Sequence, residues 1–199
     1  MSENQPLERR EVVRELLAGQ QEPLIIASTG SPSWDITAPG DRDLNFPLWN
    51  VMGGAGAIAL GLALAQPSRR VLCVCGDGEV LMGLGTLATI ALQAPPNLAM
   101  VVLDNESYGE TGGQRTHTAQ TCDLPGVAAA AGFPHVFDVR DAAELAALAK
   151  AIQSDSGPVF GAVKVRAGSY ERVLPPRDST YLKLRFRLAL LGPESLHQW

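Results

Sequence analysis

The stretch VLCVCGDGE, residues 71–79, places a carboxylate between two glycines directly after a short apolar run. An apolar run without polar interruption is typical of a strand that is buried on both faces of a sheet. Gly76 and Gly78 allow the backbone to approach a ligand closely, and Asp77 stands between them. We therefore expect a strand over residues 71–75, a turn at Gly76-Asp77-Gly78 and a helix after that turn.

The carboxylate of Asp77 limits which ligand this turn could hold. Backbone N–H groups at the start of a helix favour an anion such as a phosphate. A neighbouring carboxylate would repel that phosphate unless a divalent cation lay between the two. Mg²⁺ prefers oxygen ligands, and the amide of Asn105 is a second candidate ligand after the next apolar run. The pattern favours a magnesium-bridged diphosphate site, although Gly-Asp-Gly by itself also occurs in turns that bind nothing.

Four apolar runs along the chain are typical of buried strands. They cover residues 24–27, 71–75, 98–103 and 158–165. Segments with apolar residues at helical spacing alternate with these runs. The predicted helices cover residues 7–17, 52–64, 80–93 and 141–152, with Asp141 as the N-cap of the last one. This alternation predicts an α/β protein: a three-layer doubly wound parallel sheet with helices on both faces.

The carboxyl ends of parallel strands meet at one edge of a sheet, and ligands bind there. Three loops are predicted at this edge: residues 28–30, residues 76–78 and the segment from Asp104 onward. Residues 31–47 are rich in Pro, Asp and Gly, so we expect a long loop between the first two of these sites.

One domain is expected over residues 1–166, followed by a C-terminal tail over residues 167–199. The tail carries apolar side chains in a terminal position, at Leu182, Leu184, Phe186 and Leu190. We expect the tail to pack on the domain or on a partner subunit.

Composition argues against several classes of protein. The formal net charge is −5 and no run of Lys or Arg stands out, so a nucleic-acid surface is set aside. Cys73, Cys75 and Cys122 are spaced neither as a disulfide framework nor as a metal cluster. Residues 1–14 are polar, unlike a secretory signal, and the apolar residues 55–65 are too few to span a bilayer. We expect a soluble, cytoplasmic protein.

The spacing of the two candidate magnesium ligands resembles a known motif. Gly76-Asp77-Gly78, with Asn105 following 27 residues after Gly78, is similar to the magnesium and diphosphate motif of the thiamine diphosphate-dependent decarboxylases. The resemblance implies that Mg²⁺ is bound by the Asp77 carboxylate, the Asn105 amide and the backbone carbonyl of Ser107. Two diphosphate oxygens and one water molecule would complete six ligands.

The resemblance covers most of the chain, from residue 24 to residue 191. The segment NVMGGA, residues 50–55, is similar to the family segment that passes under the thiazolium, where Met52 would wedge the two cofactor rings into a bent shape. Core packing is the alternative role for Met52. The segments most similar to the sulfopyruvate and phosphonopyruvate decarboxylases are residues 40–46, 103–114, 174–178 and 185–187.

The resemblance also implies a set of cofactor-binding residues: Thr29, Gly30, Met52, Gly53, Gly54, Gly76, Asp77, Gly78, Glu79, Asn105, Ser107, Tyr108, Gly109 and Thr111. Glu79 stands where many relatives carry Ser or Ala. Because a carboxylate there would repel a diphosphate, we expect its side chain to point away and its backbone N–H to serve the ligand. Arg115 and His117 are candidates for contact with an acidic substrate, and the alternative is that both are ordinary loop residues.

A glutamate that activates the cofactor is missing from the predicted domain. In the family this residue comes from a separate pyrimidine-binding domain, and a single domain already accounts for this chain. We expect a pyrimidine-binding, alpha-type partner subunit to supply it, in a hetero-oligomer with at least two copies of each chain. The chain thus resembles the second, smaller subunit of a sulfopyruvate decarboxylase, which would be a thiamine diphosphate- and magnesium-dependent 2-oxoacid decarboxylase.

Three alternatives remain at this point. The β subunits of 2-oxoacid:ferredoxin oxidoreductases carry a similar Gly-Asp-Gly motif, but they depend on iron–sulfur clusters, and the three cysteines here lack cluster spacing. A carboligase would use the same cofactor to join two substrates. A non-catalytic module would bind the cofactor without turnover.

Overall fold

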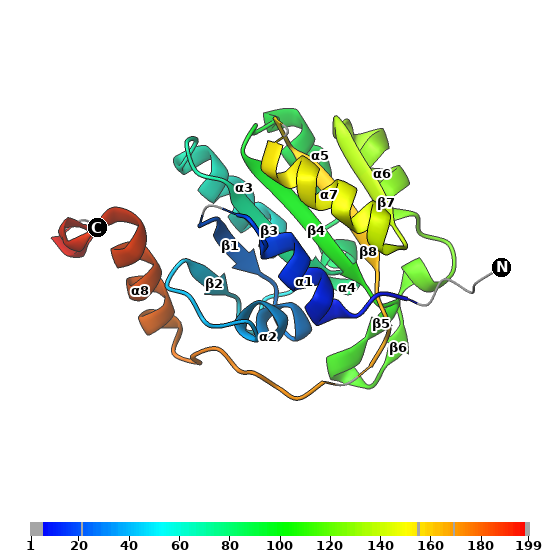
Figure 1. Ribbon diagram of the computed structural model, residues 1–199, viewed down its shortest axis with the longest axis horizontal. Helices are drawn as coiled ribbons and strands as arrows, with labels where there is room; N and C mark the ends of the chain where they lie inside the picture. Colours follow the sequence, from blue (N-terminus) through cyan, green and yellow to red (C-terminus); the bar gives the residue numbers. More distant parts are fainter. Residues whose placement is uncertain (1–5, 21, 155, 169, 198–199) are drawn as a thin grey trace.

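The computed structural model describes residues 6–20, 22–154, 156–168 and 170–197. Within these residues six strands form one sheet in the order β2-β1-β3-β4-β8-β7, and every neighbouring pair is parallel (Figure 1). The strands are β1 Leu24–Ala27, β2 Asn45–Pro47, β3 Val71–Gly76, β4 Leu98–Asp104, β7 His135–Val139 and β8 Val159–Lys164. A small antiparallel pair consists of β5 Ser107–Tyr108 and β6 Gln114–Arg115.

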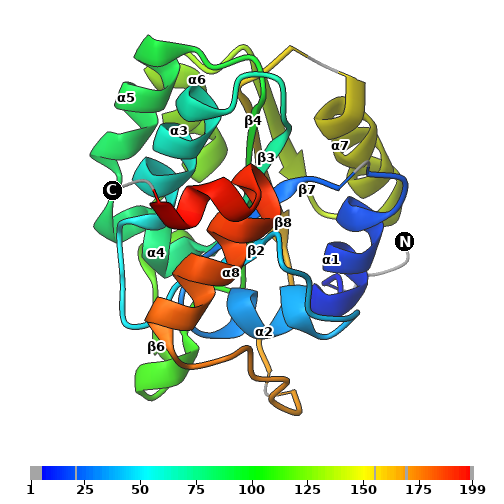
Figure 2. The ribbon, with the colours of Figure 1, turned by 90° about the vertical axis from the view of Figure 1, so that its left-hand side faces the viewer.

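Helices cover both faces of the sheet, as predicted (Figure 2). One face is covered by α3 Ala55–Ala65, α5 Gly85–Gln93 and α6 Leu124–Ala131, and the other by α1 Arg9–Leu17 and α7 Ala142–Ser154. The remaining helices are α2 Ser31–Thr37, α4 Asp77–Met82 and α8 Ser179–Leu191. Asp141 accepts a hydrogen bond from the N–H of Glu144 (2.9 Å), so it caps α7 as expected.

The core lies on both sides of the sheet because successive strand residues point to opposite faces. On β1, Ile26 packs in the cluster under α3 and α5, whereas Ile25 packs in the cluster under α1 and α7. Cys73 and Cys75 are buried in the first of these clusters, where they act as small apolar side chains. Burial on both faces explains why these strands read as continuous apolar runs.

The long loop predicted over residues 31–47 is wrong, because the segment contains α2 and the edge strand β2. Proline suits the first turn of a helix, where its missing N–H costs no hydrogen bond, and Pro32 occupies that turn. The Ser33 hydroxyl then donates to the carbonyl of Ser28 (2.7 Å). The Pro, Asp and Gly residues of this segment are typical of a loop, so the sequence did not indicate the short helix that local hydrogen bonds stabilise.

The predicted turn at Gly76-Asp77-Gly78 and the helix over residues 80–93 also need correction. Gly76 is the last residue of β3 and Asp77 the first of α4, so strand and helix follow each other directly. The helical stretch divides into α4 and α5 near Gly83. At that point α4 approaches the backbone of Gly53, since a Cβ on Gly83 would lie 2.3 Å from the Gly53 carbonyl oxygen.

The C-terminal segment crosses from β8 to the opposite edge of the sheet and continues into α8 (Figure 1). The Phe186 ring of α8 packs against the Phe46 ring of β2, with their centroids 5.4 Å apart. Arg185 forms an ion pair with Asp41 (2.5 Å) before β2. None of the helices in the described part of the chain combines the length and the apolar character needed to cross a membrane.

Candidate functional site

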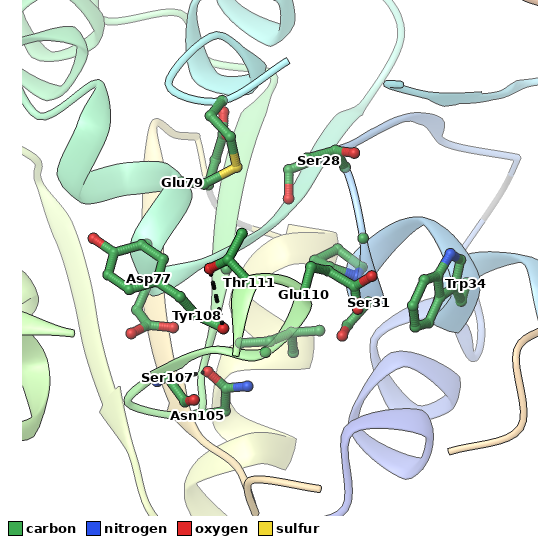
Figure 3. A pocket seen from close by; sticks show the side chains of 18 of the residues that line it. Ser28, Ser31, Trp34, Asp77, Glu79, Asn105, Ser107, Tyr108, Glu110 and Thr111 are labelled. Atoms are coloured by element: carbon green, nitrogen blue, oxygen red, sulfur yellow. Dashed lines mark hydrogen bonds between the residues drawn. The ribbon is translucent and has the colours of Figure 1, made fainter. Parts of the chain in front are cut away.

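A cavity of about 800 Å³ opens at the carboxyl ends of β1, β3 and β4. Its walls include Ser28, Thr29 and Gly30 after β1, residues 76–79 after β3, and Asn105 after β4. The expected convergence of three loops at one sheet edge is therefore confirmed. The volume lies within the range of small-molecule sites. Figure 3 shows Asp77 and Trp34 on opposite sides of this cavity, with Ser28 and Asn105 at its other two ends.

Most of the residues that the sequence analysis assigned to the cofactor line this cavity. They are Thr29, Gly30, Met52, Gly76, Asp77, Gly78, Glu79, Asn105, Ser107, Tyr108, Gly109 and Thr111. Gly53 and Gly54 follow Met52 directly but are not among the lining residues. Arg115 and His117 do not line the cavity either. In the structure the Arg115 guanidinium donates to the carbonyl of Ala119 (3.0 Å), within its own loop.

The Asp77 carboxylate is 1% exposed and lies at the junction of β3 and α4. The Thr116 hydroxyl donates to Oδ2 of Asp77, and the Thr118 hydroxyl donates to the same oxygen (3.1 Å). Neither threonine uses Oδ1. Burial raises the pKa of the Asp77 carboxyl above its usual range, and the charge of Asp104 acts in the same direction, while the threonine hydrogen bonds oppose it.

A chain of polar contacts connects this carboxylate to the neighbouring strand. Thr118 Oγ1 also lies 2.8 Å from Oδ1 of Asp104, so the two carboxylates share its single proton, and Lys164 Nζ lies 2.7 Å from Oδ2 of Asp104. Lys164 further donates to Glu106 (2.8 Å). Sequence reasoning missed Thr116, Thr118 and Lys164. Nothing in their local sequence marks them, because their contacts depend on strand register and on the return of a loop.

The loop after β4 is folded tightly by its own side chains. Asn105 Oδ1 accepts the N–H of Ser107 (3.0 Å), and Asp104 Oδ1 accepts the N–H of Glu106 (3.2 Å). The Tyr108 ring lies over Gly78, where a Cβ would be 2.4 Å from the ring carbon Cε1. Glycine is therefore required at position 78 because any side chain there would collide with Tyr108.

The segment before α3 forms another wall of the cavity. Met52 is 42% exposed and lines the cavity together with Asn50. Asn50 has a φ of 56°, a left-handed conformation that asparagine tolerates better than most residues. Its N–H lies 3.3 Å from the Thr29 hydroxyl, which holds this segment against the loop after β1.

Glu79 is a buried residue of α4. We expected its side chain to point away from a diphosphate, and the structure shows that the residue lines the cavity and is 3% exposed. One carboxylate oxygen, Oε1, accepts the N–H of Ala55 (2.8 Å) at the start of α3. The helix begins there after Gly54, which has no side chain to cap it. The carboxylate of Glu79 supplies that cap from α4.

The side of the cavity near Trp34 is formed by residues that sequence reasoning did not single out. Arg9 lines it and pairs with the fully buried Asp35 (Nε to Oδ2, 2.8 Å). The Arg172 guanidinium stacks on the Trp34 ring at 5.0 Å from its centroid. Trp49 Nε1 donates to the carbonyl of Pro176 (2.8 Å). The C-terminal segment thus supports this wall of the cavity through Trp34 and Trp49.

The oxygen groups at this site suit a magnesium ion that a ligand helps to bind. In the described residues no group of three or more His, Cys, Asp and Glu is placed to hold a metal. Asp77, Asn105 and Ser107 instead offer a carboxylate, an amide and a backbone carbonyl around one cavity. Mg²⁺ is usually held by few protein oxygens, with phosphate and water completing its octahedron. The residues present therefore fit a magnesium–diphosphate group.

Comparison with known proteins identifies a family for most of this chain. Residues 35–163 match the family described as "Thiamine pyrophosphate enzyme, C-terminal TPP binding domain". A phosphonopyruvate decarboxylase of Streptomyces viridochromogenes is 40% identical over 171 residues, which cover 85% of this chain and 42% of that protein. The chain thus spans less than half the length of that relative.

A second relative has nearly the same length as this chain. The sulfopyruvate decarboxylase subunit beta of Methanothermobacter thermautotrophicus is 38% identical over 180 residues, which cover 90% of this chain and 94% of that subunit. Among solved structures, a thiamine diphosphate-dependent 4-hydroxybenzoylformate decarboxylase of Rhodococcus jostii superposes with a TM-score of 0.73 at 19% identity. The superposition covers 85% of this chain and 34% of that one, and it supports the fold.

Proposed function

The chain belongs to the thiamine pyrophosphate enzymes, as their C-terminal TPP binding domain, and on that premise we propose that it is one subunit of a magnesium-dependent 2-oxoacid decarboxylase. The observation that carries the proposal is the meeting of Asp77 and Asn105, from two neighbouring strand ends, at a single cavity. The substrate class proposed is a 2-oxoacid with a second acidic group, as in sulfopyruvate or phosphonopyruvate. The names of the two relatives support this choice.

The residues of this chain would bind and orient the cofactor. Asp77, the Asn105 amide and the Ser107 carbonyl would hold Mg²⁺, and the glycines at positions 76 and 78 let the diphosphate approach the backbone. Thiamine diphosphate, when bound, would supply the carbon nucleophile and the electron sink that decarboxylation of a 2-oxoacid requires. Met52 forms the cavity wall on which the ring portion would rest.

A partner subunit is part of the proposal, because this chain is proposed to lack the activating glutamate. The name of the archaeal relative, a subunit beta, supports a second chain. The outer face of α3 supports it too: the helix contains no polar side chain, and Ile58 and Leu64 are exposed on it. Met52 and Met82 are further exposed apolar side chains, and both line the cavity. We propose that the pyrimidine-binding partner covers it, in an assembly with at least two copies of each chain.

The residues that select the substrate could come from this chain or from the partner subunit. Arg115 and His117 do not line the cavity of this chain. We propose that they would contact the acidic group of the substrate only where the substrate extends beyond that cavity. The partner would supply the rest of the pocket. Alanine variants of Arg115 and His117 separate the two sources, since a raised KM with unchanged cofactor affinity would assign the contact to this chain.

The test is calorimetric binding of thiamine diphosphate with Mg²⁺ to this chain with and without its partner, together with CO₂ release from sulfopyruvate and phosphonopyruvate. We expect binding and decarboxylation only with the partner, and loss of both in Asp77→Ala. Cofactor binding without turnover of either substrate would refute the substrate class. No binding in the complex would refute the proposed function itself.

A further inference from the structure

Thr116 holds one oxygen of the Asp77 carboxylate and leaves the other free. The Thr116 hydroxyl donates to Oδ2 of Asp77, and the Thr118 hydroxyl lies 3.1 Å from the same atom. In the described part of the chain no other residue donates a hydrogen bond to Oδ1, which, unlike Oε2 of Glu79, is not enclosed by protein atoms. Because Asp77 lines the cavity, Oδ1 is the oxygen that a ligand in the cavity can reach.

Thr116 is fixed in place by the segment that carries the other two candidate metal ligands. It is buried and directly follows β6, which pairs with β5 so that Ser107 and Arg115 are register partners. The N–H of Thr116 donates to the carbonyl of Glu106 (3.1 Å), and Glu106 lies between Asn105 and Ser107 in the chain. The β5–β6 pair therefore presents two candidate ligands and also holds the carboxylate of the third.

A second hydroxyl supports the Thr116 side chain. Thr118 Oγ1 lies 2.9 Å from Thr116 Oγ1 and 2.8 Å from Oδ1 of Asp104. Asp104 is buried and is held in turn by Lys164, whose Nζ lies 2.7 Å from Oδ2 of Asp104. Hydrogen bonds around a metal site orient the ligands of the metal. The network therefore restricts rotation of the Asp77 carboxylate and keeps its Oδ2 turned toward the threonines.

We propose that Thr116 is a positioning residue that makes Asp77 a one-oxygen metal ligand and thereby shifts the metal preference of the site from Ca²⁺ toward Mg²⁺. The inference rests on the proposed function, because it concerns the ion that would bridge Asp77 and the diphosphate. Ca²⁺ accepts more oxygens than Mg²⁺ and often takes both oxygens of one carboxylate, whereas Mg²⁺ demands near-ideal octahedral geometry. A carboxylate whose Oδ2 is already hydrogen-bonded offers one oxygen, which suits the smaller ion.

Substitutions of Thr116 separate the orientation of the carboxylate from its charge, because Asp77 itself is unchanged. Thr116→Val keeps the shape of the side chain and removes the hydroxyl, which frees Oδ2 to bind a metal ion. Thr116→Ser keeps the hydroxyl and should rescue the metal preference. Thr121→Val is a matched control, because Thr121 is an exposed residue of the same loop.

The experiment measures the dissociation constant of thiamine diphosphate on the complex of the full chain with its partner, once in saturating Mg²⁺ and once in saturating Ca²⁺. Fluorescence of Trp34 and Trp49, which line the cavity, reports binding. In Thr116→Val we expect the ratio of the affinity with Mg²⁺ to the affinity with Ca²⁺ to fall about tenfold, the size of one hydrogen bond to a charged group. In Thr116→Ser and Thr121→Val the ratio should stay within about twofold of wild type.

Each other outcome decides against the inference. An unchanged ratio in Thr116→Val, or an equal fall in Thr116→Ser, would exclude the positioning role of the hydroxyl and leave the proposed function intact. A wild-type complex that binds thiamine diphosphate with neither ion would overturn the proposed function and the inference together. If Thr116→Val is unfolded by circular dichroism, Thr118→Val is measured in its place, because its hydroxyl lies beside the same oxygen. The ratio should then fall about threefold, and an unchanged ratio would count against the inference.

Discussion

The ammonium group of Lys164 lies 2.7 Å from Oδ2 of Asp104, and these two residues are register partners on the neighbouring parallel strands β8 and β4. The ion pair is connected to the candidate magnesium ligand through one hydroxyl. Thr118 Oγ1 lies 2.8 Å from Asp104 Oδ1 and 3.1 Å from Asp77 Oδ2. The orientation of the Asp77 carboxylate is thus set by groups from β4, from β8 and from the loop after β6.

Replacing Lys164 by methionine should destabilise the fold by about 2 kcal/mol at pH 7, because Asp104 is buried and would lose its cation. Burial lowers the pKa of Lys164, but its hydrogen bonds and charge interactions with Asp104 and Glu106 outweigh burial and raise it overall. A raised pKa means that this stabilisation is complete below the unfolded value of about 10.4 and disappears as the pH rises through the folded value.

Urea unfolding of wild type and Lys164→Met between pH 7 and pH 12 checks this expectation. The difference in free energy of unfolding between the two proteins should shrink above about pH 10.4. A difference that is constant across this range would show that the ammonium charge contributes nothing.

Asp77→Asn should weaken cofactor binding and at the same time stabilise the cofactor-free chain at pH 7. Burial raises the pKa of the Asp77 carboxyl, so its ionisation opposes folding above the raised value, and an amide carries no such penalty. The amide oxygen can still accept from Thr116. Affinity for thiamine diphosphate with Mg²⁺ should fall by about a hundredfold, since a charged metal ligand is lost.

Thermal unfolding in EDTA measures the stability part of this prediction. The stability of Asp77→Asn relative to wild type should decrease as the pH is lowered through the raised pKa of Asp77 toward the usual value of about 3.9. A variant less stable than wild type at pH 7 would contradict the prediction.

Gly83→Ala should destabilise the protein by about 2 kcal/mol or more, because the new Cβ would lie 2.3 Å from the Gly53 carbonyl oxygen and backbone cannot yield easily. Gly61→Ala is the matched control, since Gly61 is an exposed position inside α3 with no atom within 4 Å of the added Cβ. Gly61→Ala should be more stable than wild type by about 0.5–1 kcal/mol. Chemical unfolding of the isolated chain measures both, and equal effects would argue against the close contact between α4 and Gly53.

Thr118→Val keeps the shape of the side chain but removes the hydroxyl that bridges Asp77 and Asp104. We expect a loss of about 1–2 kcal/mol in unfolding free energy, because the two buried carboxylates lose the hydroxyl whose proton they share. Thr121→Val, at an exposed position of the same loop, should change stability by less than about 0.5 kcal/mol. A similar loss in both variants would point to a general effect on the loop.

Part of this protein was determined by local sequence. The strands β3 and β4 were predictable because their residues are apolar on both faces. Such continuous apolar runs are typical of a parallel sheet that helices cover on both sides. The two strand-end polar residues, Asp77 and Asn105, were predictable for the same reason: parallel strands bring their carboxyl ends to one edge. These inferences need only the chain direction and the periodicity of apolar residues.

Tertiary structure decided the rest. Pro32 reads as a loop residue until the buried turn of α2 gives it a place in a helix. Lys164 is 60 residues from Asp104 in the chain and becomes its partner only through the β4–β8 register. Glu79 gained its role as the cap of α3 because α4 and Gly53 come into backbone contact. In each case the stabilising interaction is a contact between segments that are distant in the sequence. No local pattern of residue types predicts such a contact.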